Sequence, residues 1–216
     1  MSIRLSIGLC CIFLLFSGKK NSPIITKTQQ PSLIAKGKSD LFKIDPDYID
    51  TTYTYTDTKG RKLVIQNSTP KGGLPYYDAN EKEYIYFVFW TRITNESDDA
   101  VVINMNFPEN SLKVPTAPDA NFNLVLPKKQ KMIPKYVPFF LYGIGDVRTI
   151  MDHQFGKPSS FKKKIKPNSS VMFYVVALSD QRRNGVEKAG LNIDDKDLVY
   201  TIKGKPLNCG QLRFID

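Results

Sequence analysis

Hydrophobic and polar residues alternate along short runs of the chain from residue 51 onward, with turn residues between them at intervals of roughly 8–15 positions. Residues 51–56 and 61–66 flank Asp57-Thr58-Lys59-Gly60, which is typical of the turn of a β-hairpin. Residues 83–93 are apolar on both alternating faces, which indicates a central strand covered from two sides. The pattern predicts a mainly β fold, built as a sandwich or a barrel.

Further runs are expected to surround this central strand. Residues 171–178 are also apolar on both faces and are predicted to lie beside residues 84–93. Residues 101–107 carry alternating apolar side chains, which predicts a half-buried partner strand after the polar turn 95–99. Shorter strands complete the prediction at residues 122–126, 198–202 and 211–215.

Prolines and glycines mark the expected interruptions. Residues 68–73 hold one proline and two glycines and are expected to form a loop that redirects the chain. Residues 132–145 are apolar but hold two prolines and two glycines, which predicts irregular structure. Asp146 is predicted to cap one short helix that runs to Phe155.

The strand and turn phrases resemble those of immunoglobulin-like β-sandwich domains in exported bacterial proteins. The resemblance lies in the long strand, polar turn and alternating strand of residues 86–107, and in Ile-Lys-Pro-Asn-Ser-Ser before residues 171–178. It covers roughly half of the mature chain by pattern and lacks the Cys…Trp…Cys framework of antibody domains. It implies an immunoglobulin-like antiparallel β-sandwich with one short helix, and it brings no active site with it.

Residues 1–18 have the layout of a signal peptide, with Arg4 ahead of an apolar run that is too short to span a membrane. We expect an exported protein, periplasmic, outer-envelope or secreted, from a bacterium rather than a eukaryote. An uncleaved membrane anchor and a lipid anchor on Cys10 or Cys11 are the alternatives. Residues 19–48 are expected to be a tether, and residues 49–216 a single domain.

The chain has 216 residues with a net charge of +10, and 41% of them are hydrophobic. This composition predicts a globular core, and the charge favours anionic partners. Residues 161–166 are expected to form an edge strand on which Lys162, Lys163 and Lys164 discourage unwanted pairing. A second group of lysines occurs at positions 128, 129, 131 and 135. Lipid headgroups or an acidic polysaccharide are the expected anions, and nucleic acid is not an expected partner.

The sequence nominates no catalytic, cofactor-binding or metal-binding residue. His153 is the only histidine, which removes most metal sites and most Ser/His or Cys/His schemes, and we expect it at a solvated helix end. Cys209 has no basic neighbour and is expected to be packed and inert. Residues 192–197 gather acidic side chains without the glycine and terminal glutamate of a calcium loop, so a solvated turn is expected there.

Aromatic residues in the irregular stretch are the main candidates for contact with a partner. They are Tyr136, Phe139, Phe140 and Tyr142, joined by Leu141, with Tyr76 and Tyr77 as companions. Aromatic side chains on loops of a rigid β scaffold are frequent contacts for proteins and glycans. The alternative is that the same side chains close an open end of the sandwich.

Three functions agree with these features. The first is a non-enzymatic envelope or secreted binding domain that contacts another envelope protein or an anionic surface polymer, with the N-terminal segment as a route to membrane association. The second is a glycan or peptide hydrolase with an unrecognised carboxylate site, and the third is a structural spacer. Exposed aromatics at 136–142 would favour binding, whereas a cleft with two close acidic residues would favour hydrolysis.

Overall fold

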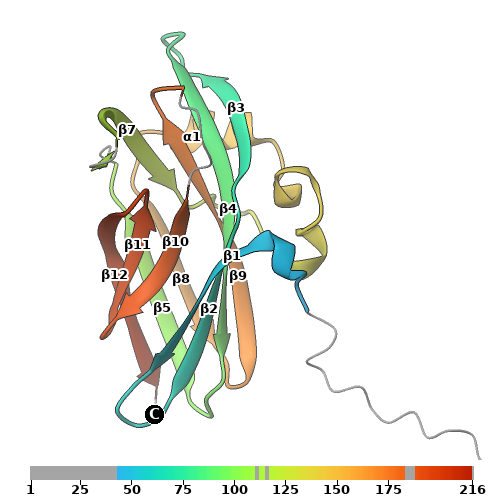
Figure 1. Ribbon diagram of the computed structural model, residues 1–216, viewed down its shortest axis with the longest axis vertical. Coiled ribbons are helices and arrows are strands. Elements are labelled where there is room, and N and C mark those ends of the chain that lie inside the picture. The colour runs from blue at the N-terminus through green and yellow to red at the C-terminus, as the bar shows by residue number, and fades with distance from the viewer. Residues whose placement is uncertain (1–42, 110–111, 115–116, 183–187, 216) are drawn as a thin grey trace, which may run out of the picture. The chain divides into compact units, whose positions relative to one another are not determined.

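The computed structural model describes residues 43–109, 112–114, 117–182 and 188–215. The expected signal peptide at 1–18 and most of the expected tether at 19–48 lie outside the described residues. The described residues are mainly β, in two antiparallel sheets, with 3-10 turns and one α-helix (Figure 1). The prediction of a mainly β fold with one short helix is confirmed.

The first sheet has seven strands in the order β1-β2-β4-β9-β7-β6, and β3 pairs with β4 beside this path. Its strands are β1 (Ile49–Thr56), β2 (Lys62–Ser68), β3 (Lys71–Tyr77), β4 (Glu83–Asn95), β6 (Leu112–Val114), β7 (Ala117–Val125) and β9 (Ser169–Ser179). The hairpin of β1 and β2 and the long pairing of β4 with β9 are both as predicted.

The second sheet has five strands in the order β10-β11-β12-β5-β8. They are β5 (Ala100–Phe107), β8 (Ser159–Ile165), β10 (Ala189–Asp194), β11 (Asp197–Ile202) and β12 (Lys205–Ile215). β8 lies at the edge of this sheet, so the prediction of an edge strand with three lysines is confirmed. The sequence did not predict β10.

The sequence predicted that the alternating strand at 101–107 would be a partner of the central strand, but β5 does not pair with β4. β5 lies in the second sheet between β12 and β8, and its buried side chains face the first sheet across a common core. The preceding turn carries the chain from one sheet to the other, and within it the Asn95 amide donates to the Asp99 carbonyl at 2.7 Å. Burial on one face gives the same period whichever sheet holds the strand.

Part of the loop expected at 68–73 is strand. β3 begins at Lys71 and pairs with β4 through Gly72, where the pairing slips at a bulge before Leu74. Gly72 has φ of 136°, and a Cβ there would lie 2.6 Å from the Tyr86 carbonyl oxygen. The glycine therefore allows a close approach of two strands, whereas its sequence context suggested only a loop.

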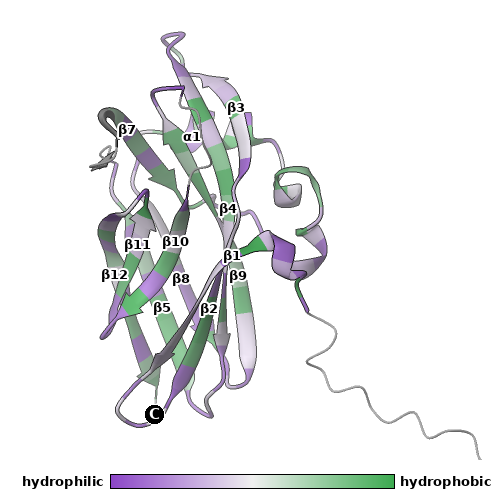
Figure 2. Ribbon diagram, viewed as in Figure 1, coloured by the Kyte–Doolittle hydropathy of each residue, from purple (hydrophilic) through white to green (hydrophobic). Residues whose placement is uncertain are grey.

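The first sheet is covered on both faces. Its inner face shares a hydrophobic core with the second sheet, in which Phe89, Phe122, Phe107 and Tyr200 are buried. On its outer face Val88, Trp90 and Tyr174 pack against the chain that follows β7, including Leu141 and the helix α1 (Val147–Gln154). Figure 2 shows the resulting hydrophobic stretches along β4 and β9. This double cover explains why both faces of the central strand are apolar, and it confirms the prediction of a strand covered from two sides.

The helix α1 begins where the sequence predicted. Asp146 caps it by accepting the backbone N–H of Thr149 at 3.2 Å. Val147, Ile150 and Met151 are the buried side chains of α1, and all three belong to the outer-face cluster. The helix therefore serves to cover the upper outer face of the first sheet.

One polar side chain joins the two sheets, and we refer to its contacts as the Asn67 clamp. Asn67 on β2 is 1% exposed, and its amide accepts the backbone N–H of Leu191 and donates to the Leu191 carbonyl, both at 2.9 Å. It also accepts from the Thr91 hydroxyl at 2.9 Å. Gly190 makes room for it, because a Cβ on Gly190 would lie 2.8 Å from the amide nitrogen of Asn67. The clamp holds β10 against β1 and β2.

Candidate functional site

The aromatic loop, residues 133–145, projects two phenylalanines from the outer layer. It contains two 3-10 turns, Pro134–Tyr136 and Phe140–Gly143, in agreement with the irregular structure predicted. Phe139 is 53% exposed and Phe140 is 75% exposed, the largest values among the large hydrophobic side chains described. An exposed pair of adjacent aromatic side chains is the kind of feature that marks contact surfaces.

The backbone directly after Phe140 is held in a conformation that residues with side chains seldom adopt. Leu141, Tyr142 and Gly143 have φ values of 46°, 57° and 67°. Only glycine occupies this left-handed region without cost, so neighbouring contacts must stabilise the other two residues. Leu141 is 6% exposed and Tyr142 is fully buried, and burial of both side chains supplies part of that stabilisation.

Tyr142 anchors the loop to the scaffold through polar contacts. Its hydroxyl donates to the Thr69 carbonyl at 2.5 Å, and its own carbonyl accepts from the Tyr174 hydroxyl at 2.8 Å. The ring lies edge-on to Trp90 with 6.2 Å between ring centroids. Burial raises the pKa of Tyr142, so the hydroxyl stays a neutral donor at ordinary pH.

Lys71 holds the other half of the loop. Its ammonium donates to the carbonyls of Val137 at 2.9 Å and Phe139 at 2.8 Å. The same nitrogen lies 4.3 Å from the Tyr142 ring centroid and 4.8 Å from that of Tyr48. Burial lowers the pKa of Lys71. Two carbonyls and two ring faces offset the loss of water around this cation, so the loop presents its phenylalanines on a fixed backbone.

The predicted aromatic residues divide into two groups. Tyr77, Phe139 and Phe140 are exposed and Tyr136 is half-buried, whereas Tyr76 and Tyr142 are buried. The Tyr76 hydroxyl donates to the Asp152 carboxylate at 3.0 Å, and burial together with that contact raises the pKa of Tyr76 to about 12. Tyr76 and Phe140 line one small pocket of about 320 Å³ beside Asp146 and Arg148. Exposed and core-packed side chains therefore both occur among the predicted aromatic residues.

A larger hollow, which we call the edge groove, lies along the side of the sandwich where β8 and β9 meet. Its volume is about 1150 Å³. It is lined from β8 by Phe161 and Lys163, from β9 by residues 169–174, from the outer face by Arg92 and its neighbours, and from the chain after β7 by residues 130–134. The Phe161 and Phe173 rings both line it and lie tilted against each other with 4.6 Å between centroids.

The predicted lysines of β8 face two directions. Lys162, Lys163 and Lys164 are all exposed. Lys163 lies opposite Ile103, whose side chain is buried in the core between the sheets, so Lys163 points to the inner side at the open edge and lines the edge groove. Lys162 and Lys164 point to the outer face of the second sheet. The three lysines therefore do not form one patch.

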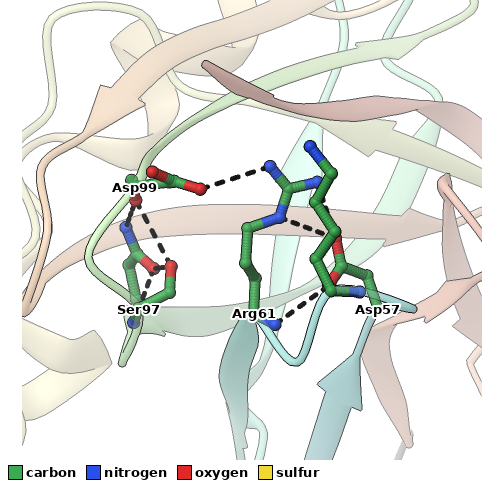
Figure 3. Close-up of polar contacts among 6 residues, drawn as sticks. Asp57, Arg61, Ser97 and Asp99 are labelled. Carbon is green, nitrogen blue, oxygen red and sulfur yellow. Dashed lines mark hydrogen bonds and ion pairs between the residues drawn. The ribbon is translucent and has the colours of Figure 1, made fainter. Parts of the chain in front are cut away.

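A polar cluster at the Asn95 end of β4 has a structural role. Arg61 donates to Asp57 through Nε at 2.7 Å and reaches Asp99 at 3.4 Å, as Figure 3 shows. Ser97 donates its hydroxyl to the Asn95 amide oxygen at 2.6 Å within the adjacent turn. The Arg61 guanidinium also lies over the Phe214 ring at 4.1 Å. These contacts tie the β1–β2 turn to the β4–β5 turn and to β12.

The remaining sequence candidates are placed as follows. His153 is exposed in the last turn of α1, with Nδ1 2.7 Å from the Thr149 carbonyl, so the expected helix-end position is confirmed. Cys209 is buried, which confirms a packed side chain, and burial raises the pKa of its thiol to about 12. Residues 192–197 close the tight turn between β10 and β11.

Neither the edge groove nor the small pocket beside Asp146 brings two acidic residues together. Among the described residues, Glu96 is the one acidic side chain that lines the edge groove, and Asp146 is the one that lines the smaller pocket. In the same part of the chain no three histidine, cysteine or acidic side chains lie close enough to hold a metal ion. The helices of that part are all too short or too polar to span a bilayer.

Sequence reasoning missed Lys71, Asn67 and the edge groove. Lys71 sits in a glycine-rich stretch that looks like a loop, and the carbonyls that accept its hydrogen bonds are more than 60 positions away. Asn67 ends an alternating strand at a position where burial of an amide is visible only from its partners. Comparison of the chain with known protein families, with curated proteins and with solved structures gave no match.

Proposed function

We propose that this protein is an exported, non-enzymatic binding domain that uses the aromatic loop to contact another envelope protein or an anionic surface polymer. The observation that carries the proposal is the exposure of Phe139 and Phe140 on a backbone pinned by Lys71 and Tyr142. Fully burying a phenylalanine side chain contributes about 1.5–3 kcal/mol, so two such side chains supply a substantial part of a binding energy.

Preorganisation supports the same proposal. A loop that is already ordered loses little conformational freedom when a partner binds, and this raises affinity for a given contact area. The left-handed residues 141 and 142 cost stability, and nothing in core packing requires Phe140 to be 75% exposed. Backbone strain and apolar side chains in water do not stabilise the folded chain, and both features agree with a role of this loop in binding.

Export belongs to the proposal through residues 1–18, whose basic start and short apolar run are typical of a signal peptide. Cell fractionation with mass determination of the mature N-terminus tests it. Recovery in the periplasm, envelope or medium with residues 1–18 removed is the expected result. A cytoplasmic chain that keeps its N-terminus would contradict export.

The immunoglobulin-like relationship also remains a proposal. Two antiparallel sheets and chain crossings between them, as from β4 to β5 and from β8 to β9, support it. Trp90 departs from the family pattern, since it packs against Tyr142 on the outer face instead of between the sheets. A strand-by-strand comparison of connection order with experimentally determined immunoglobulin-like domains tests the relationship, and a different order would contradict it.

Site-directed photo-crosslinking in producing cells tests the role of the aromatic loop. A benzoyl-phenylalanine residue replaces Phe140, and the same residue at Tyr53, which is 42% exposed on β1, is the matched control. We expect a discrete adduct from position 140 and none from position 53, because a specific partner contacts one surface only. Adducts of equal yield from both positions, or from neither, would overturn the proposal.

Co-sedimentation with an anionic polysaccharide separates the two classes of partner. If the partner is a polymer, binding should fall steeply with salt and should weaken when Phe139 and Phe140 are both replaced by serine. If the partner is a protein, the polymer should not co-sediment, and the crosslinked adduct should have a defined mass. Polymer binding that is unchanged by the two serine replacements would show that the loop is not the contact.

A further inference from the structure

One edge of β9 lacks a strand partner over most of its length. β4 pairs with β9 from Ser169 to Ser179 along one edge. On the other edge β7 pairs only with residues 176–179. No strand of the described residues pairs with that edge over residues 169–175. This free edge borders the edge groove.

The direction of the free backbone groups follows from the ladder. Trp90 on β4 donates its backbone N–H to the Ser68 hydroxyl, away from β9. In an antiparallel pair, residues directly opposite each other either both point toward the partner strand or both point away. Tyr174 lies opposite Trp90, so its backbone groups, and by alternation those of Met172 and Ser170, point to the free edge.

The free edge carries none of the usual protection against pairing. Edge strands are commonly blocked by lysine, proline or a covering element. β8, the neighbouring edge of the second sheet, has three consecutive lysines. Residues 169–175 of β9 read Ser-Ser-Val-Met-Phe-Tyr-Val, without a charge or a proline. Ser169 and Val171 are half-buried and Ser170 is exposed, whereas residues 172–175 are buried, so the accessible part of this edge is its Ser169 end. One of two adjacent edges is therefore protected by charge, and the other is open to a strand at that end.

Charges around the groove indicate what kind of strand fits. Lys163 lines it from the inner side, Arg92 from the outer face, and Lys131 from the chain after β7. Glu96, the acidic side chain on the lining, is already bound to Lys62 at 2.9 Å. Side chains of an added strand would alternate between the inner and outer sides, and those on the inner side would meet Lys163. An acidic segment is therefore favoured.

We propose that β9 accepts an extended acidic segment of a partner protein as an additional strand along its accessible end, residues 169–172. Backbone pairing with Ser170 and Met172 supplies affinity, and Lys163 selects acidic side chains. A second copy of this chain is a poor occupant, because each copy carries a net charge of +10 and brings further lysines to the same edge. The site is separate from the aromatic loop and does not depend on it.

A synthetic peptide of alternating glutamate and valine, about seven residues long so that at ~3.3 Å per residue it extends past the accessible end of β9, is the probe. Fluorescence anisotropy of the labelled peptide measures its affinity for the full chain. The control is a peptide of identical sequence with N-methyl groups on alternate residues. The methylated peptide keeps the charge but loses the backbone donors of one edge, so we expect it to bind at least about tenfold more weakly.

Two variants test the two halves of the recognition. Ser170→Pro removes a backbone donor that faces the free edge and leaves the β4 ladder intact, and should weaken peptide binding about tenfold. Lys163→Glu should weaken it about fivefold or more by repulsion, while Lys205→Glu, the same charge change on exposed β12, should change it less than about twofold. Circular dichroism checks the fold of each variant.

Several results would overturn the proposal. One is equal affinity for the two peptides, and another is absence of binding to the wild-type chain. A third is binding of an anionic polysaccharide that is lost in the Lys163→Glu variant and kept in the Ser170→Pro variant, which would make a polymer the ligand of the groove. A fourth is a dimer in sedimentation that Ser170→Pro dissociates, which would make a second copy the occupant. Serine at both Phe139 and Phe140 should leave peptide affinity unchanged, so this test and that of the aromatic loop fail independently.

Discussion

The two sides on which the edges of the sheets meet are built in opposite ways. On one side β10 is held against β1 and β2 by the Asn67 clamp, and Lys188 pairs with Asp50 at 3.7 Å. On the other side β8 and β9 touch mainly through the tilted rings of Phe161 and Phe173, and the edge groove lies between them. The same sandwich is therefore sealed on one side and open on the other.

The difference shows how a polar group can close a sandwich whose described residues hold no disulfide. The mature chain expected from cleavage near residue 18 keeps one cysteine, Cys209, which is buried and free. Asn67 takes the place of a covalent link by acting as donor and acceptor for one residue of the facing sheet. Where such a clamp is absent, backbone groups of an edge strand stay available to a partner.

Removal of the clamp should have the largest effect on stability. Asn67→Ala leaves the N–H and carbonyl of Leu191 and the Thr91 hydroxyl without this buried partner, and we expect a loss of about 3–5 kcal/mol in the free energy of unfolding. Urea denaturation measures it. Asn104→Ala, at an exposed position of β5, is the control, with a loss below about 0.5 kcal/mol. A loss below about 1 kcal/mol for Asn67→Ala would mean that the clamp does not close the sandwich.

Proline at adjacent positions of β9 distinguishes its two edges. The backbone of Val171 faces β4, so Val171→Pro removes a ladder hydrogen bond and should cost about 3 kcal/mol. Ser170→Pro should cost less than about 1 kcal/mol because its N–H faces the free edge. Thermal unfolding of the two variants gives the comparison. Equal losses would show that the residues 169–175 have no free edge.

A methyl group at Gly190 tests how tightly the sealed side is packed. Gly190→Ala places a Cβ 2.8 Å from the Asn67 amide nitrogen and 2.9 Å from its Cγ, and should cost about 1–3 kcal/mol. In the background of Asn67→Ala the same change should cost clearly less, since the crowded atoms are gone. Additive losses in this double-mutant cycle would contradict direct contact between the two residues.

The smallest expected effect is pH-dependent and lies away from both sides. Burial alone would raise the pKa of Asp57, but hydrogen bonds and charge from Arg61 outweigh it and lower that pKa. A lowered folded-state pKa gives stability that is present above the unfolded value near ~4 and is lost as pH falls through the folded value. Asp57→Asn should therefore cost at most about 1 kcal/mol at pH 7, and the difference from wild type should shrink below pH ~4. A difference that grows on acidification would refute this.

Local pattern was sufficient for most elements of the fold. Residues 83–93 and 171–178 were expected as paired central strands because both faces are apolar, and they pair as β4 and β9. Asp146 was expected to begin the helix, and three lysines to mark an edge strand, since capping and edge protection depend on residues close in sequence. These features need no knowledge of the distant chain.

Pairing partners and exposure were decided by tertiary structure. The period of β5 is the same in either sheet, so its place in the second sheet depended on the turn at Asn95 and on the facing core. Neighbouring aromatic residues met opposite fates, with Phe140 exposed and Tyr142 buried, because Thr69, Lys71 and Trp90 surround only one of them. The sequence determined which segments become strands; which edges are sealed or open depended on contacts between residues far apart in the chain, where burial and hydrogen bonding act together.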